Sequence, residues 1–132
     1  MKLKAADYVV LIVADLDASV RFYTEVLNLP LHHLAPNGKF AELDTGVTHI
    51  ALYTREAMSE TLGREISAPD RDRPGFELGF KVDDVDAVFA DVVTAGIEAA
   101  VPPTTKFWGQ RTAYVYDPDG HLVEFAQDLP EQ

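Results

Sequence analysis

Hydrophobic and polar positions follow strand and helix periods in turn through the first 54 residues of this chain. Tyr8–Val13 is rich in β-branched residues and predicts a buried strand. The apolar residues that follow recur at helical spacing: Leu16, Val20, Tyr23 and Leu27. Asp15 stands where it can cap this helix, and Asn28 stands where it can end it.

Three short strands are predicted after this helix. They span Leu31–Ala35, Phe40–Thr45 and Val47–Tyr53. Asn37-Gly38 between the first two is a strong signal for a hairpin turn. The first part of the chain therefore predicts the element order βαβββ.

The same order is predicted again from Phe76 onward. Phe76–Val82 is a strand, and Asp83 or Asp84 caps a second helix that Gly96 ends. The apolar stripe of this helix is Val85, Val88, Phe89, Val92 and Val93. Ile97–Val101 then predicts a short strand that Pro102-Pro103 stops.

The chain closes with a predicted hairpin over Thr112–Ala126, reached through a loop at Lys106–Arg111. Asp117-Pro118-Asp119-Gly120 is its turn, because proline presets φ at the second place and glycine accepts positive φ. His121 follows in the turn, and His32 and His33 lie on a short edge strand. All three imidazoles are expected to face solvent.

The two halves form an internal repeat: Val13–Ala18 matches Val82–Ala87 at a constant offset of 69 residues, with Asp15 on Asp84, and the hairpins align at a slightly longer offset, with Leu52 against Phe125. We predict an α+β fold with modules at 1–54 and 76–132, joined by a linker at 55–75 with one or two helical turns near Glu56–Leu62. The Asp70–Arg73 charge run in the linker reads as a solvated loop. Neither module buries both faces of its sheet alone, so side by side they would form a curled mixed sheet with helices outside.

Composition and charge narrow the range of chemistries, partners and locations that the chain can have. The chain has 132 residues, 47% hydrophobic and 25% charged, and no cysteine, which excludes disulfides and thiolate chemistry. Its net charge of −11 argues against nucleic-acid partners. No apolar run is long enough for a bilayer, and Met1–Lys4 lacks a signal-peptide core, so a cytoplasmic location without membrane partners is expected.

Three stretches carry a resemblance to a known family: Val9–Tyr23, Leu78–Val85, and Trp108–Arg111 running into Asp117–Glu124. Together they resemble the vicinal oxygen chelate superfamily, which includes glyoxalase I, bleomycin-resistance proteins, fosfomycin-resistance enzymes, methylmalonyl-CoA epimerase and extradiol dioxygenases. The likeness covers nearly the whole chain apart from the linker and tail. It implies the paired βαβββ fold. It does not select one function, because proteins that share this fold carry out several chemistries.

Strand alternation predicts which side chains face the concave side of the curled sheet. They are Tyr8, Val10, Ile12, His49, Ala51, Tyr53, Glu77, Gly79, Lys81, Thr112, Tyr114, Tyr116, Leu122 and Glu124. Tyrosines, one histidine and two carboxylates thus converge on one concavity. Arg111 and the loop aromatics Phe107 and Trp108 complete the ligand-binding candidates, since planar aromatics suit a flat ligand.

The resemblance implies metal ligands at four positions, which here hold Tyr8, Ala51, Glu77 and Glu124. Histidine is common at the first and third of these positions, and alanine cannot ligate. This set is poor for zinc, nickel or iron(II), whereas magnesium or manganese could accept Glu77, Glu124 and waters. The expectation is therefore no metal cofactor, with a hard divalent ion as the alternative.

Two function classes follow. The first is a metal-independent, homodimeric binding protein for a small, aromatic or cationic molecule, as bleomycin-resistance proteins are. The second is a lyase, isomerase or dioxygenase using a divalent ion on Glu77 and Glu124. A third reading is metal-free acid–base catalysis by Tyr8, His49 or the two carboxylates, one of which would keep a proton.

Overall fold

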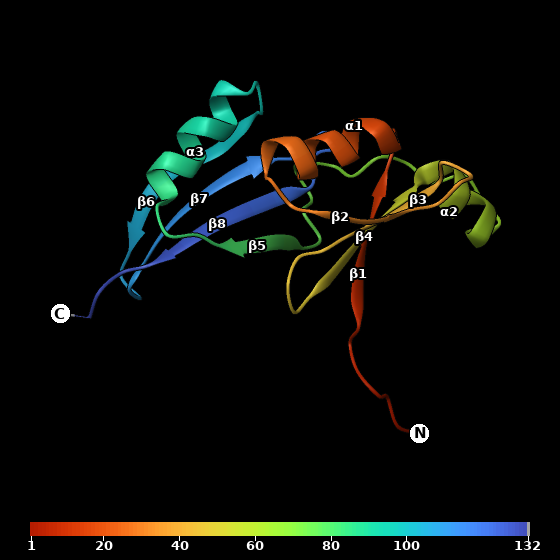
Figure 1. Cartoon of the computed structure of the whole chain (residues 1–132), viewed down its shortest axis with the longest axis horizontal. Coiled ribbons are helices and arrows are strands. Elements are labelled where there is room, and N and C mark those ends of the chain that lie inside the picture. Colours follow the sequence, from red (N-terminus) through yellow and green to blue (C-terminus); the bar gives the residue numbers. More distant parts are fainter. Residues whose placement is uncertain (132) are drawn as a thin grey trace. The chain divides into compact units, whose positions relative to one another are not determined.

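The computed structural model describes residues 1–131 and divides the chain into two compact units, Met1–Ala68 and Pro69–Gln132. Each unit is built on a four-stranded mixed sheet (Figure 1). The α+β class and the repeated βαβββ order predicted from the sequence are confirmed. No helix within residues 1–131 combines the length and apolar character needed to cross a bilayer.

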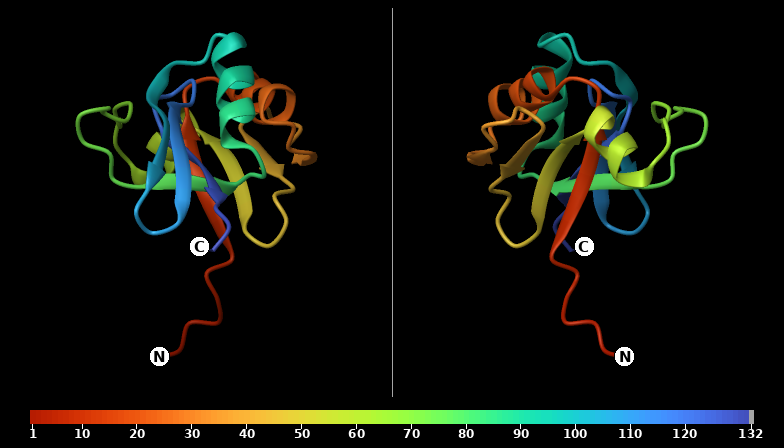
Figure 2. Two further views of the ribbon diagram at one scale, coloured as in Figure 1. Left: turned by 90° about the vertical axis from the view of Figure 1, so that its left-hand side faces the viewer. Right: turned by 90° about the vertical axis from the view of Figure 1, so that its right-hand side faces the viewer.

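The first unit contains four strands and three helical segments. They are β1 (Tyr8–Val13), α1 (Leu16–Arg21), the π-helical η1 (Phe22–Val26), β2 (Leu31–Leu34), β3 (Phe40–Leu43), β4 (His49–Thr54) and α2 (Arg55–Leu62). The strand order of the sheet is β1-β4-β3-β2. The residues before Tyr8 run beyond β1 without joining the sheet (Figure 2). α2 confirms the helical turns predicted within the linker, and Thr54 caps it by accepting from the Ala57 amide.

The helix after β1 changes its geometry partway along. Asp15 caps α1 as predicted, with the Ala18 amide 3.1 Å from its carboxylate. From Phe22 the helix is π-helical, and the Leu27 amide donates to the Phe22 carbonyl at 3.0 Å. The Thr24 hydroxyl donates to the Val20 carbonyl at 2.7 Å, which offers a local reason for the departure from α geometry. Asn28 ends the segment with a φ of +60°.

The core of the first unit lies on the face of the sheet opposite the face that carries Tyr8 and Tyr53. Its buried members are Leu11, Val13, Leu16, Phe22, Tyr23, Ala41, Leu43, Ile50 and Leu52. α1 packs on β3 and β4 and supplies Leu16 to this core. The period-2 pattern of the strands therefore assigns the two faces correctly.

The second unit repeats the plan, and its last three strands are longer than their counterparts in the first unit. Its elements are β5 (Glu77–Lys81), α3 (Val85–Thr94), β6 (Ala99–Lys106), β7 (Gln110–Tyr116) and β8 (Leu122–Asp128). The strand order of the sheet is β5-β8-β7-β6. α3 packs on β6, β7 and β8 (Figure 1) and buries Val85 and Val92. Ala113, Val115, Val123 and Phe125 are buried on the same side of the sheet.

Pro102 and Pro103 do not stop the sixth strand, so the prediction of a short strand ending at Val101 is wrong. β6 continues to Lys106, and its pairing with β7 shifts register between Val101 and Thr104. β6 is one of the two edge strands of its sheet. A proline has no amide proton to donate, and at an edge or a bulge that loss is tolerated.

Candidate functional site

The face of the second sheet opposite α3 carries the densest group of predicted site residues. Register places Glu124 between Gly79 on β5 and Tyr114 on β7, and places Leu122 beside Tyr116. Because alternate residues share a face, Glu77 lies on the same side two residues before Gly79. Three candidates from three neighbouring strands, Glu77, Tyr114 and Glu124, are therefore brought together.

A short hydrogen bond fixes the centre of this group. The Tyr114 hydroxyl donates to Oε2 of Glu124 at 2.7 Å. Gly79 leaves room for this carboxylate, because a Cβ at position 79 would lie 3.3 Å from Glu124 Oε1. The phenol and the carboxylate are both half-buried. We refer to Glu77, Tyr114 and Glu124 as the carboxylate–tyrosine cluster.

Proton affinities within the carboxylate–tyrosine cluster are raised. Although Glu77 is exposed overall, partial desolvation of its carboxyl, with the negative charge of Glu124, raises the pKa of Glu77, and a hydrogen bond with Tyr114 partly opposes this. Burial, the hydrogen bond to Glu124 and the charges of both carboxylates raise the pKa of Tyr114. Desolvation is the largest cause of both shifts and the carboxylate charges add to it, so a cation or a hydrogen-bond donor would be stabilised at this site.

Arg71 borders this face, although the sequence pattern placed it in a solvated loop. Its guanidinium carbon lies 4.9 Å from the ring centroid of Tyr116, and its Nη2 lies 3.2 Å from Glu98 Oε1. Tyr116 is thus already covered by a cation. No local pattern could reveal this contact, because it joins the linker to a strand more than forty residues later.

The first sheet holds the remaining predicted residues, Tyr8, His49 and Tyr53. Tyr8 pairs directly with His49 in the parallel β1–β4 register, and its side chain is 63% exposed. His49 Nδ1 lies 3.6 Å from Oε1 of Glu42 on β3. Glu42 was missed, although the alternation of Phe40–Leu43 signals that it shares the face with His49. Tyr53 lies within 3.4 Å of the Thr61 hydroxyl of α2.

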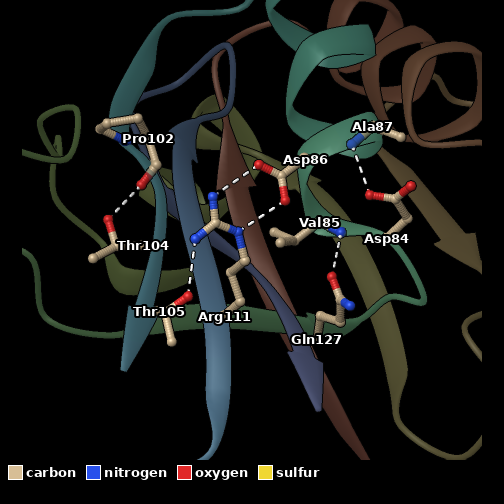
Figure 3. Close-up of polar contacts among 9 residues, drawn as sticks. All are labelled: Asp84, Val85, Asp86, Ala87, Pro102, Thr104, Thr105, Arg111 and Gln127. Carbon is tan, nitrogen blue, oxygen red and sulfur yellow. Dashed lines mark hydrogen bonds and ion pairs between the residues drawn. The ribbon is translucent and has the colours of Figure 1, made fainter. Parts of the chain in front are cut away.

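Arg111 lies on the other side of the second sheet, away from the carboxylate–tyrosine cluster. Its guanidinium donates to both carboxylate oxygens of Asp86, at 2.8 and 2.9 Å, and to the Thr105 hydroxyl at 3.0 Å (Figure 3). Asp86 stands in the first turn of α3. These bonds hold the start of α3 to β6 and β7, so Arg111 has a structural role.

The loop aromatics lie at the tip of the β6–β7 hairpin. Phe107 is 97% exposed and Trp108 is 56% exposed, and their rings meet edge to face at 5.0 Å. The Trp108 indole donates to Gln110 Oε1 at 2.9 Å, and Lys106 lies over its ring. A groove beside this tip is lined by Lys106, Trp108, Leu129 and Pro130 among others.

The prediction that His121 faces solvent is wrong. It is 8% exposed, and its Nδ1 lies 2.9 Å from Oδ2 of the buried Asp117. Asp117 Oδ1 also accepts from the amides of Asp119 and His121, so the carboxylate braces the β7–β8 turn. Phe76 packs edge-on against the imidazole. His32 and His33 are exposed, as predicted.

Comparison with known proteins identifies the family. A model of the Glyoxalase/Bleomycin resistance protein/Dioxygenase superfamily matches residues 5–125, and the chain belongs to this superfamily. It is 37% identical over 121 residues to the uncharacterized protein YraH of Bacillus subtilis, covering 90% of this chain and 94% of the relative. It is 31% identical over 126 residues to virulence protein STM3117 of Salmonella typhimurium, covering 92% and 82%.

A solved structure shares the fold. A glyoxalase/bleomycin resistance protein/dioxygenase from Nocardioides superposes with a TM-score of 0.77 at 25% sequence identity. The alignment covers 100% of this chain and 91% of the Nocardioides protein. The family resemblance seen in the sequence is therefore confirmed at the level of both family and fold.

The metal that this family implies can be tested against the donor atoms present. Ala51 is 2% exposed and offers no donor, and Tyr8 offers a phenol where histidine would suit zinc, nickel or iron(II). The second sheet offers two carboxylates, one of them already bonded by Tyr114. These family positions do not fit a nitrogen-preferring ion, whereas Glu77 and Glu124 fit a hard ion such as magnesium or manganese that keeps its waters.

Proposed function

We propose that this protein is a metal-independent small-molecule binding protein of the glyoxalase/bleomycin-resistance type, with antibiotic sequestration as its task. The carboxylate–tyrosine cluster, on the face of the second sheet opposite α3, carries the proposal. Two carboxylates surround one phenol there, and burial with mutual repulsion raises the pKa of Glu77. A ligand that brings a positive charge or several hydrogen-bond donors would be stabilised at this face.

The aromatic side chains beside the cluster support a ligand with a flat, apolar part. Tyr114 and Tyr116 share the face with Leu122, and the guanidinium of Arg71 over Tyr116 shows that a cation can stack on this surface. The net charge of −11 favours the approach of cationic molecules over long range. A planar aromatic molecule with a cationic group meets these conditions.

Calorimetric titration of chelator-treated protein with glycopeptide and planar aromatic antibiotics tests the proposal. We expect a cationic aromatic member to bind, and Glu124→Gln to weaken its binding about tenfold or more, since a charge-assisted hydrogen bond contributes about 1.5–3 kcal/mol. Glu25→Gln is the matched control, because Glu25 is an exposed carboxylate on η1. Absence of binding across the panel would count heavily against the proposal.

The alternative function is a divalent-metal-dependent lyase, isomerase or dioxygenase that uses Glu77 and Glu124. The position of the two carboxylates on neighbouring strands of one face favours it. A bound hard ion would supply Lewis acidity to a substrate oxygen. Metal analysis of protein purified without chelator separates the two functions: a stoichiometric ion lost in Glu124→Ala would replace the first proposal by the second.

A third candidate function is catalysis without a metal by side chains of the first sheet. His49 Nδ1 lies 3.6 Å from Glu42 Oε1 beside Tyr8, and this imidazole would act as a general base oriented by the carboxylate once the two atoms close to hydrogen-bonding distance. Such an activity would be insensitive to chelators and would depend on pH. The cytoplasmic location and the homodimer expected from the sequence also stay predictions.

A further inference from the structure

The face of the first sheet that carries Tyr8, His49 and Tyr53 holds a second group of side chains able to ligate a metal, apart from the family's metal positions. Glu42 on β3 lies between histidines on both neighbouring strands. His33 on β2 is its direct register partner, and His49 on β4 lies 3.6 Å away through Nδ1 and Oε1. Two imidazoles and one carboxylate therefore flank each other across three adjacent strands.

A β-bulge selects the histidine that faces Glu42. Leu31 pairs with Leu43, and regular pairing would then bring His32 opposite Glu42. The register shifts between Leu31 and His33, so His33 takes that place and His32 does not. Bulges re-aim side chains in this way and are frequent beside functional sites. The His33 ring lies 6.5 Å from the ring of Phe40, which shares the face with Glu42.

The spacing between His49 and Glu42 suits ligands of one ion better than it suits a hydrogen bond. At 3.6 Å the nitrogen and oxygen are too far apart for a good hydrogen bond. Two ligands of a tetrahedral zinc ion, each about 2.0–2.1 Å from the metal, lie roughly 3.3 Å apart. A movement of a few tenths of an ångström brings these atoms to that separation.

We propose that His33, Glu42 and His49 form a binding site for a nitrogen-preferring divalent ion such as zinc, cobalt or nickel. Imidazole is the ligand these ions favour, and a carboxylate completes a three-residue set with an open position for water. His33 joins the set by rotating about its χ1 bond, which its exposure permits. Bound metal would tie the edge strand β2 to β3 and β4.

Another group of histidine and carboxylate side chains, Asp117, Asp119 and His121, is already compact, because its ligand atoms lie within 4.8 Å of one another. It is nevertheless the weaker candidate. Asp117 Oδ1 accepts two backbone amides, and both carboxylate oxygens lie within 3.1 Å of the His121 Nδ1. A metal there would have to break the bonds that hold the β7–β8 turn.

Zinc titration of tag-free, chelator-treated protein, followed by the imidazole ring signals in a ¹H–¹⁵N correlation spectrum, tests this site. The chain has four histidines, so each can be assigned. We expect one zinc ion per chain, with the ring signals of His33 and His49 shifting and those of His32 and His121 unchanged. Shifts at His121 or His32, or no binding, would overturn the proposal.

Variants give an independent readout by calorimetry. Loss of even an outer-shell partner typically weakens metal binding 10- to 100-fold, so Glu42→Gln and His49→Asn should each weaken zinc binding at least about tenfold. His32→Asn is the matched control, being the neighbouring exposed histidine that does not pair with Glu42. Glu124→Gln should leave zinc affinity unchanged. Equal weakening by His32→Asn and His49→Asn would contradict the assignment.

Discussion

Tyr114 is the central residue of the carboxylate–tyrosine cluster. Its hydroxyl donates to Glu124 at 2.7 Å, and burial with two nearby carboxylates raises its pKa. A phenol held in this way is kept protonated and oriented. It serves Glu124 as a fixed donor, and any ligand that approaches the carboxylate must compete with it or complement it.

Removal of the Glu124 charge should make Tyr114 easier to ionise. In Glu124→Gln the neutral amide no longer repels the phenolate, so the pKa of Tyr114 should fall toward the ordinary value of about 10. Ultraviolet absorbance titration at alkaline pH follows the five tyrosines of the chain. Glu25→Gln should leave the titration unchanged. Superimposable titrations of wild type and Glu124→Gln would show that the carboxylate does not govern Tyr114.

The raised pKa of Glu77 determines in which direction this residue makes the stability of the folded protein change with pH. Its pKa is raised in the folded state, so folding favours its protonated form. The associated stability is complete below the unfolded pKa of about 4.3 and is lost as pH rises through the raised folded pKa. Glu77→Gln should therefore gain melting temperature relative to wild type between pH 4 and pH 7.

Thermal unfolding at pH 4, 5, 6 and 7 measures this difference. Because the Glu77 side chain is exposed, we expect a gain of only a degree or so, small beside the 4–8 °C that about 1 kcal/mol gives in a small domain. Glu25→Gln should show no comparable trend. A Glu77→Gln variant that lost melting temperature relative to wild type on going from pH 4 to pH 7 would reverse the assigned sign.

For single residues, the sequence predicted the face of the sheet on which a side chain lies better than it predicted that side chain's contacts. Strand alternation placed Glu124, Tyr114 and His49 on the correct faces, because a period of two depends only on local geometry. Arg71 could not be found this way, since its contact with Tyr116 joins distant segments. His121 was misplaced because turn composition indicates exposure, whereas here Asp117 draws the imidazole inward.

Among the elements, the start of α3 is a boundary that the sequence predicts and that substitutions can test. The sequence left Asp83 and Asp84 as alternative caps, and the structure selects Asp84, whose carboxylate accepts from the Ala87 amide at 3.1 Å. Gln127 of β8 adds a second cap by accepting from the Val85 amide at 3.0 Å. The start of the helix is thereby tied to the sheet.

Asp84→Ala should destabilise the protein by about 1 kcal/mol, the usual cost of losing a side-chain cap. Asp83→Ala is the matched control at the neighbouring position and should change the free energy of unfolding by no more than about 0.5 kcal/mol. Urea unfolding followed by circular dichroism provides both values. Equal effects of the two substitutions would mean that Asp84 does not act as the cap.

Strands and helices were predictable to different extents. The helix caps at Asp15 and Asp84 and the turn at Gly38 follow from local chemistry, and each appears where the sequence predicts it. The extension of β6 through Pro102 and Pro103 was not predictable locally, because a proline is tolerated only once its strand is known to lie at an edge. The change to π-helix at Phe22 likewise escaped the spacing of apolar residues.

For the whole molecule, the internal repeat was the most informative feature of the sequence. The match of Asp15 to Asp84 predicted two βαβββ modules, and both sheets have the corresponding strand order. The same repeat exposes a functional asymmetry, because Ala51 occupies in the first module the place of Glu124 in the second. Fold follows from the repeated pattern, whereas function depends on the residues that differ between the copies.

The homodimer expected from the sequence is a prediction at this scale. A dimer in solution would have twice the chain mass of 14.6 kDa. Light scattering coupled to size-exclusion chromatography at several concentrations measures it directly. A monomeric mass at every concentration would rule out the dimer while leaving the ligand face of the second sheet as proposed.

The most direct test of metal-independent binding is a crystal structure of chelator-treated protein with the tightest ligand from the antibiotic panel. We predict density for the ligand against Tyr114 and Tyr116, with a cationic or donor group at Glu77 and Glu124 and no ion between the two carboxylates. Density for a divalent ion held by Glu77 and Glu124, with the ligand absent or bound through that ion, would contradict the proposal and favour the metal-dependent enzyme.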